Sequence, residues 1–179
     1  MHYDHSTGSS SGVYLMMPLQ LARASFSALR SPLLNRASTT GQLCFSLFYF
    51  AVGNTNVPAL TLQYIDLTHL KSNGLKVQLN TTRTLQWVKF EQQFSDVGQV
   101  FQFEIRTASQ TSNIVSDLGI DDIKISPGLC RSAAQPTTTT PVPLSEKVLD
   151  CNFEERSSRG CAWKYDSNAW VVTNERGRK

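Results

Sequence analysis

The sequence lacks a long hydrophobic run. Its longest apolar stretch, about Leu43 to Val52, is roughly ten residues long, whereas a membrane-spanning helix needs about 20. Another short apolar run, residues 13–17, follows acidic and polar residues rather than basic ones, so it does not resemble a secretory signal. We therefore expect the chain to be a piece of a larger protein.

A strong charge of either sign is also missing. The formal net charge is +3, and the basic residues are scattered except in the terminal run 176–179. Nucleic-acid binding therefore has little support. The terminal run is interpreted as a solvated end, with a basic cleavage site as the alternative.

Cysteine and histidine are scarce. None of the four cysteines forms a C-x-x-C pair, and there are only three histidines, which argues against a zinc or thioredoxin-like site. An even number of cysteines beside a Thr/Pro-rich spacer fits disulfides formed in an oxidising compartment. Four cysteines allow three pairings, and counting does not choose among them. They are Cys44, Cys130, Cys151 and Cys161.

Catalytic motifs are missing as well. There is no G-x-S-x-G nucleophile motif and no H-E-x-x-H, and His2, His5 and His69 lack the spacing of metal ligands. Glu91 and Glu104 could be drawn as a glycosidase pair. Both fall on alternating polar faces of predicted strands, however, so we interpret them as solvated charges and expect no enzyme.

What the chain does have is a seven-residue aromatic stretch, Cys44–Phe50, that carries no charge. Alternation places apolar side chains on both of its faces, which predicts a central strand covered on both sides. A helix fits the periodicity too, but the aromatic content and the stop at Gly53 favour a strand.

Further short strands separated by turns predict an all-β fold, a β-sandwich or barrel. Residues 22–29 alternate weakly, with a helix as the competing interpretation. Asn73-Gly74 is the strongest hairpin signal, between Leu67 and Val77. The other predicted strands are residues 13–17, 59–65, 87–91, 100–106 and 120–126.

The composition changes after residue 131. Residues 132–148 are rich in Thr and Pro, cannot build a core, and are expected to form a disordered, O-glycosylated linker. Beyond them, residues 149–179 carry a second ordered signature with cysteines and tryptophans. We therefore expect a sandwich over residues 1–131, a linker, and a further fragment.

Taken together, these residues resemble the MAM domain of meprins, neuropilins and receptor tyrosine phosphatases. The segments that resemble the family are D-H-S-T at residues 4–7, G-V-Y-L at 12–15, S-P at 31–32, C-F-S-L-F-Y-F at 44–50, L-G-I-D-D-I at 118–123 and P-G-L-C at 127–130. The resemblance implies a jelly-roll-type β-sandwich that acts in adhesion or subunit assembly.

After the linker, C-N-F-E at residues 151–154 and C-A-W at 161–163 resemble the opening of a second MAM copy. The first copy lacks this opening, so residues 1–131 resemble a MAM domain without its N-terminal part. The resemblance implies the disulfides Cys44–Cys130 and Cys151–Cys161. We further hypothesise that residues 149–179 fold back to supply the missing edge of the first sandwich.

Asp121 and Asp122 are the best candidates for a metal site. Asp121 shares parity with Ile123, so its carboxylate is expected to point inward, where it needs hydrogen-bond donors or a hard cation such as Ca²⁺. The resemblance permits a structural Ca²⁺ near this strand, joined by Glu154 if the fold-back occurs. The alternative is hydrogen-bonded or exposed carboxylates without metal.

Two other features have functional interpretations. Asn80 begins the only N-x-S/T sequon, so it is a glycosylation candidate in a secreted chain. Trp163 and Trp170 could form a sugar-stacking platform, but a core and a boundary tryptophan are the preferred interpretation.

The sequence thus predicts a non-catalytic extracellular interaction or adhesion module of a secreted or membrane-associated protein. Its partners would be other extracellular proteins, with homophilic contact included, and not nucleic acid. The alternatives are a glycan-binding lectin-like jelly roll and an ancillary domain of a secreted metalloprotease.

Overall fold

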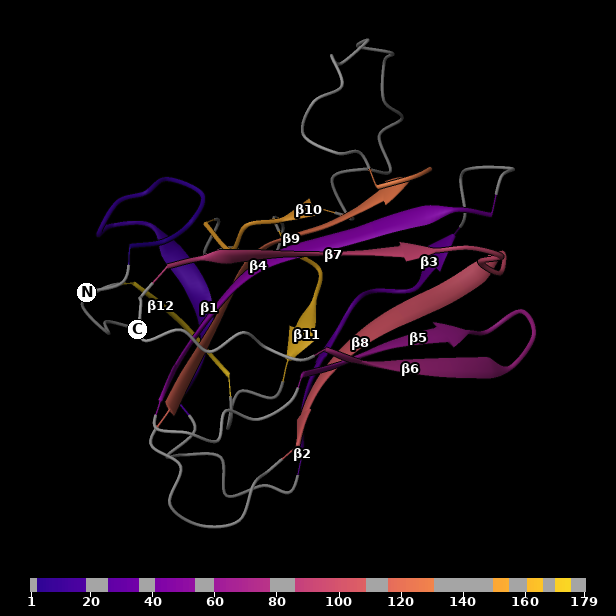
Figure 1. The fold of residues 1–179 in the computed structure, drawn as a ribbon, viewed down its shortest axis with the longest axis horizontal. Helices are drawn as coiled ribbons and strands as arrows, with labels where there is room; N and C mark the ends of the chain where they lie inside the picture. Colours follow the sequence, from indigo (N-terminus) through magenta and orange to yellow (C-terminus); the bar gives the residue numbers. More distant parts are fainter. Residues whose placement is uncertain are drawn as a thin grey trace, which may run out of the picture.

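A computed structural model shows the chain as strands and turns arranged in two antiparallel sheets (Figure 1). It describes residues 3–18, 26–35, 41–53, 60–77, 86–108, 116–130, 150–154, 161–165 and 170–174. Within these ranges there is no helix, and therefore none long and apolar enough to cross a membrane. The predicted all-β sandwich is confirmed.

The first sheet has the strand order β12-β1-β9-β4-β7, with β10 also paired to β9. In Figure 1, β4, β7 and β9 lie together in one layer above β5, β6 and β8. The strands are β1 (Val13–Pro18), β4 (Leu43–Gly53), β7 (Val88–Phe94), β9 (Ser116–Pro127), β10 (Asp150–Cys151) and β12 (Val171–Asn174).

The second sheet has the order β11-β2-β8-β5-β6, with β3 also paired to β8. Residues 26–30 form a strand, and they overlap the second half of the ambiguous stretch 22–29. The helix interpretation is therefore wrong for residues 26–29, which are the part of that stretch that the structure describes. The strands are β2 (Phe26–Arg30), β3 (Leu34–Asn35), β5 (Leu60–Asp66), β6 (Lys71–Val77), β8 (Val100–Ala108) and β11 (Lys164–Tyr165).

Strand β4 is central to the first sheet and pairs with both β7 and β9. Its inward side chains join the core, where the Phe45 ring lies 5.1 Å from Phe103 on β8. On its other face Phe50 packs edge-on against Tyr14 and Trp87. Burial on both faces, as the aromatic stretch predicts, follows from these two sets of contacts.

Three short strands from residues 150–174 pair with strands of residues 3–130. β12 lies antiparallel to β1 at the edge of the first sheet, and β10 pairs with β9. β11 pairs with β2 at the edge of the second sheet. Both sheets are therefore extended by the same C-terminal segment.

The hairpin between β5 and β6 differs from the predicted one. The turn lies at residues 67–70, and Asn73 and Gly74 are paired inside β6 with Tyr64 and Gln63. The Asn-Gly prediction is therefore wrong. The turn that forms begins after Asp66, whose Oδ1 accepts hydrogen bonds from the amides of Thr68 and His69, which is how an aspartate stabilises a tight turn.

Strand β9 contains a bulge at Asp121-Asp122. The register passes from Ser46–Lys124 to Phe48–Asp121, so Leu47 faces two residues of β9, and Asp122 has a φ of 47°. An extra residue reverses the alternation of a strand. As a result Ile120 and Ile123 both join the core.

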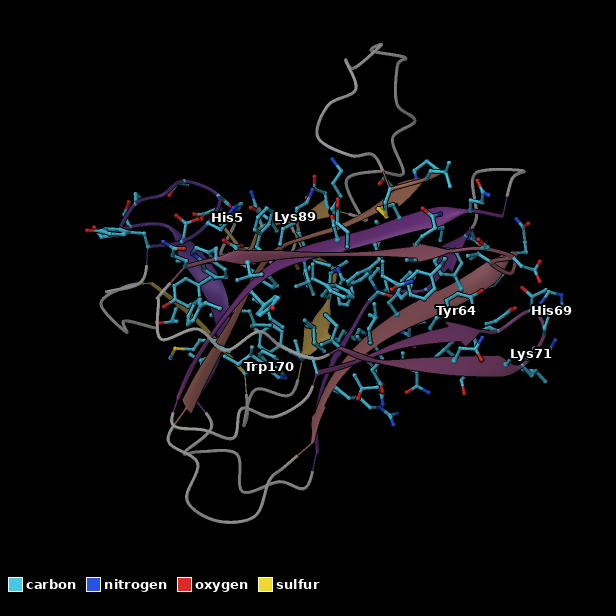
Figure 2. The ribbon with its side chains drawn as sticks, viewed as in Figure 1. His5, Tyr64, His69, Lys71, Lys89 and Trp170 are labelled. Atoms are coloured by element: carbon cyan, nitrogen blue, oxygen red, sulfur yellow. A yellow bond between two sulfur atoms is a disulfide. The ribbon has the colours of Figure 1, made fainter. Side chains whose placement is uncertain are left out.

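The bulge corrects the expectation for Asp121. This residue was expected to share the interior face with Ile123, but it lies opposite Phe48, and directly opposed residues share a face. The Phe48 ring stacks on His5, with 3.4 Å between the ring centroids, and Figure 2 shows His5 on the side of the sheet away from the second sheet. Asp121 is fully buried there, outside the sandwich core.

Glu104 is the second residue whose environment was predicted wrongly. Instead of being solvated, its side chain is 1% exposed and lies between the guanidinium groups of Arg30 and Arg106. Two cations supply the partners that a buried carboxylate requires. Glu91 is exposed and pairs with Lys89 at 2.7 Å, so the two glutamates occupy different environments.

We predict that Gly119→Ala destabilises the domain. A Cβ atom at Gly119 would lie 2.0 Å from the Phe50 ring, and overpacking of this kind costs roughly 1–3 kcal/mol. Chemical denaturation would measure the loss. The matched control is the same substitution in a Phe50→Leu background, where the smaller side chain leaves room and the added cost should be smaller; an equal cost in both backgrounds would contradict the contact.

Candidate functional site

A cluster of four carboxyl groups forms where the first described residues meet β9 and the C-terminal segment. We call Asp4, Asp121, Asp122 and Glu154 the acidic cluster. Asp4 is 1% and Asp121 0% exposed, and electrostatic interactions connect Asp121 with both Asp4 and Asp122. Three distant parts of the sequence therefore converge on one site.

Asp121 is held by donors from residues 5 and 6. Its Oδ2 accepts hydrogen bonds from the His5 amide at 3.0 Å and the Ser6 amide at 3.4 Å, while Oδ1 accepts one from the Asp122 amide at 2.9 Å. Burial, and then the neighbouring Asp122 carboxylate, raise the pKa of Asp121 to about 8. Its hydrogen bonds only partly offset the loss of water.

Asp4 and Glu154 form the second half of the cluster. Burial acts to raise the pKa of Asp4, but hydrogen bonds from Thr7, Glu154 and Ser9 outweigh it and leave that pKa below its ordinary value. Burial raises the pKa of Glu154, and the charges of Asp4 and Asp122 add to the effect. The pKa values of the two carboxyl groups are thus shifted in opposite directions.

Glu154 also connects the C-terminal segment to β1. Its Oε1 accepts a hydrogen bond from the Val13 amide at 3.1 Å. Gly12, the residue before, packs so closely on Asp4 that a Cβ there would lie 1.9 Å from the Asp4 carboxylate. The sequence-based prediction included Glu154 but missed Asp4, although Asp4 begins the D-H-S-T segment that carries part of the resemblance.

His5 closes the cluster on its outer side. Its Nδ1 lies 2.6 Å from Asp122 Oδ2, and its ring stacks on Phe48. The His5 ring therefore interacts with β9 and β4, which are distant from it in the sequence. Ser6 adds a hydroxyl that donates to Asp122 Oδ1 at 2.7 Å.

The donor chemistry of the acidic cluster suits a hard cation, because every one of its side chains offers carboxylate oxygens. Within the ranges that the structure describes, however, no three His, Cys, Asp or Glu side chains are arranged as a metal-binding group. Protein donors already fill several of the oxygens. Calcium at Asp121, Asp122 and Glu154 therefore stays a prediction, and hydrogen-bonded carboxylates are the arrangement that these contacts describe.

Two disulfides are formed. Cys44 is joined to Cys130 and Cys151 to Cys161, which are the pairings that the family resemblance implies. The described cysteines include no free thiol. Each bridge closes a loop and restricts the unfolded chain, an effect worth about 3–5 kcal/mol in the entropic model.

Trp163 and Trp170 lie in the core. They are 4% and 1% exposed, and the Phe45 ring lies 6.5 Å from that of Trp163. Neither indole offers a face to solvent, so the sugar-stacking platform is wrong. The expected core tryptophan is confirmed, but neither tryptophan lies at the boundary. Asn80, the linker 132–148 and the basic run 176–179 lie outside the described residues.

The opposite end of the sandwich presents exposed apolar side chains. Here the turn at residues 67–70 meets the start of β8, since the Leu67 amide donates to the Val100 carbonyl. Figure 2 places His69 and Lys71 at this end. Four leucines at this end are exposed, and we call them the leucine end. They are Leu33 (62% exposed), Leu67 (39%), Leu70 (88%) and Leu129 (64%).

The register shows that these leucines share one end. Leu34, next to Leu33, pairs with Phe101, and so does Asp66, next to Leu67. Gly128, next to Leu129, donates to the Gln42 carbonyl at the start of β4. The connection between β7 and β8 joins both groups, because the Val97 amide bonds the Gly41 carbonyl.

These observations define the class of protein as a two-layer all-β sandwich whose sheets are both extended by a C-terminal segment. One disulfide lies within residues 3–130 and the other within that segment. The MAM domain family (meprin/A5/mu) matches residues 1–131. The chain belongs to the MAM domain family. Domains of this family are extracellular adhesion and protein-interaction modules and are generally non-catalytic.

For the acidic cluster we predict a calcium effect on thermal stability. Ca²⁺ should raise the melting temperature of the intact chain above its value in chelator, because a divalent cation offsets the buried negative charge. Glu154→Gln keeps an oxygen for the Val13 amide but removes one charge, so it should weaken the effect several-fold. Calorimetry that found no difference between calcium and chelator would leave the hydrogen-bonded arrangement.

For the turn at the leucine end we predict a dependence on acid pH. The His69 side chain, with the amides of His69 and Thr68, holds the pKa of Asp66 below its ordinary value despite burial. The ionised form is therefore favoured by folding, so this stabilisation is present above the unfolded pKa of about 3.9 and is lost as the pH falls through the folded value.

Asp66→Asn should remove that part of the pH dependence, since the amide oxygen still accepts the turn hydrogen bonds but does not titrate. Urea unfolding at pH 5, 4, 3 and 2 would measure it. The wild type should lose more stability than the variant between pH 4 and pH 2, and parallel curves would contradict the assignment.

Proposed function

We propose that this chain is a non-catalytic extracellular interaction module that acts in adhesion, within a larger secreted or membrane-associated protein. The family, the two disulfides and the exposed leucine end support this proposal. Its partners are other extracellular proteins. The partner that best suits the leucine end is a second copy of the chain, which would contact it through its own leucine end.

Leu70 is the observation that carries the proposal. Its side chain is 88% exposed, and its backbone has a φ of 53°, in the left-handed region that a bulky residue rarely adopts. A glycine or asparagine would form this turn at lower cost. Leucine contributes nothing to the core at this position, so a role in contact with a partner explains its presence.

The leucine end is suited to contact with itself. An isologous dimer places the same patch on both subunits, and apolar side chains are self-complementary where like charges would repel. In the turn the Asp66 carboxylate is paired with the His69 ring at 2.6 Å, and the exposed Lys71 follows Leu70 directly. Clustered exposed apolar side chains of this kind mark interaction surfaces.

We predict that Leu70→Gly weakens self-association without destabilising the fold. Glycine adopts the left-handed backbone conformation at lower cost than leucine. The free energy of unfolding should therefore stay within about 1 kcal/mol of wild type or increase. Beads coated with the wild-type chain should aggregate, and those coated with the variant should aggregate several-fold less. Analytical ultracentrifugation would give the corresponding change in dimer dissociation constant.

The control is Tyr3→Ser. Tyr3 is 50% exposed and lies at the other end of β7, where its carbonyl accepts the Trp87 indole N–H. This variant should aggregate like wild type. Equal aggregation of the Leu70→Gly variant would remove the leucine end from the contact, and binding on a glycan array without self-association would favour the lectin alternative.

A further inference from the structure

Each of the two disulfides lies within a different part of the described chain. Cys44–Cys130 lies within residues 3–130, and Cys151–Cys161 lies within residues 150–174. No disulfide among the described residues joins one part to the other. We call residues 150–174 the clasp and residues 3–130 the body.

The clasp is nevertheless part of the fold. It pairs with the edges of both sheets, through β12 on β1 and β11 on β2, and with β9 through β10. Its large side chains fill the core between the sheets, as Trp170 in Figure 2 illustrates. Among the described residues of the clasp, the buried ones are Cys151, Phe153, Trp163, Trp170 and Thr173.

The contacts that hold the clasp are non-covalent. Lys124 and Asp150 lie 3.9 Å apart and are both more than half exposed, so this ion pair contributes little. The indole N–H groups of Trp163 and Trp170 have no hydrogen-bond partner among the described residues. Strand pairing and apolar burial therefore supply most of the attraction, and both can be reproduced by the same segment of another molecule.

The connection between the body and the clasp, residues 131–149, has more residues than are needed to join its two ends. Asp150 lies beside Lys124 on β9, and Cys130 is bonded to Cys44, which pairs with Ser126 two residues further along β9. Residues 131–149 could span roughly 60 Å when extended. Their length permits pairing with the chain's own body and also with a neighbouring body.

We propose that the clasp is an exchangeable strand ligand, and that the seat it occupies on β1, β2 and β9 accepts the clasp of a second copy of this chain. In dilute solution a tethered clasp has a millimolar effective concentration and pairs with its own body. Exchange between copies increases with protein concentration and produces reciprocally paired dimers. Leu70 lies in the turn between β5 and β6, and neither of these strands pairs with the clasp.

The first experiment tests whether the clasp is held without covalent bonds. A protease site is inserted between Thr138 and Thr139 of the full chain, and the purified protein is cut. The two fragments should separate in non-reducing denaturing electrophoresis and co-elute in native chromatography. Mixing isotopically heavy and light cut protein should yield hybrid complexes, approaching half of the total at equilibrium in native mass spectrometry.

The second experiment tests exchange between intact copies. Met16 and Val171 are directly paired between β1 and β12, at the Cα spacing of about 4.5–5.5 Å that antiparallel strands share with disulfides. One copy carries Met16→Cys and the other Val171→Cys. After concentration and mild oxidation, a disulfide-linked dimer of the two copies should form in an amount that rises with protein concentration.

Two controls define the outcome. Met16→Cys with Val172→Cys is one residue out of register and should give at least tenfold less linked dimer, whereas both changes in one chain should lock the clasp internally and abolish exchange. Leu70→Gly should not alter the linked dimer, so exchange and the adhesive contact are distinguished. Fragments that part in native chromatography, or an in-register pair that links no better than the out-of-register pair, would overturn the proposal.

Discussion

The structure depends on the burial of β4 on both of its faces. An uncharged aromatic strand cannot be half solvated, so each face must be covered by something else. The second sheet covers the inner face through contacts such as Phe45 with Phe103. The outer face is covered by Trp87 and by the segment of residues 3–12, with His5 stacked on Phe48. The fold is therefore a sandwich with an additional layer over one sheet.

This outer layer explains why the acidic cluster is buried. Asp121 would be a solvent-facing residue of β9 if residues 3–12 were not placed over it. Their amides donate hydrogen bonds to the carboxylate, but its own burial and then the neighbouring Asp122 carboxylate still raise the pKa of Asp121 to about 8. The cluster connects the first described residues, β9 and the clasp, so the local electrostatics and the completion of the sheets are coupled through Glu154.

Sequence reasoning succeeded where burial follows a simple pattern and failed where it depends on neighbours. The two-faced apolar run predicted β4, and alternation predicted β8. Alternation also predicted a solvated Glu104, but a sequence does not reveal that Arg30 from β2 and Arg106 converge on it. The face of the strand predicted for Asp121 was wrong because the one extra residue of a bulge reverses the alternation of side chains. Asn73-Gly74 failed as a turn because Asp66 stabilises an earlier one.

The sequence by itself determined the all-β class, the central strand and the family, because hydrophobic alternation and short motifs are properties of neighbouring residues. Only the tertiary structure decided which residues meet across long separations. It placed Asp4 and Glu154 together, paired the clasp with both sheets, and gathered four leucines at one end. The physical reason is that strand register, bulges and the covering of a face are set by contacts between distant segments, and local composition does not encode them.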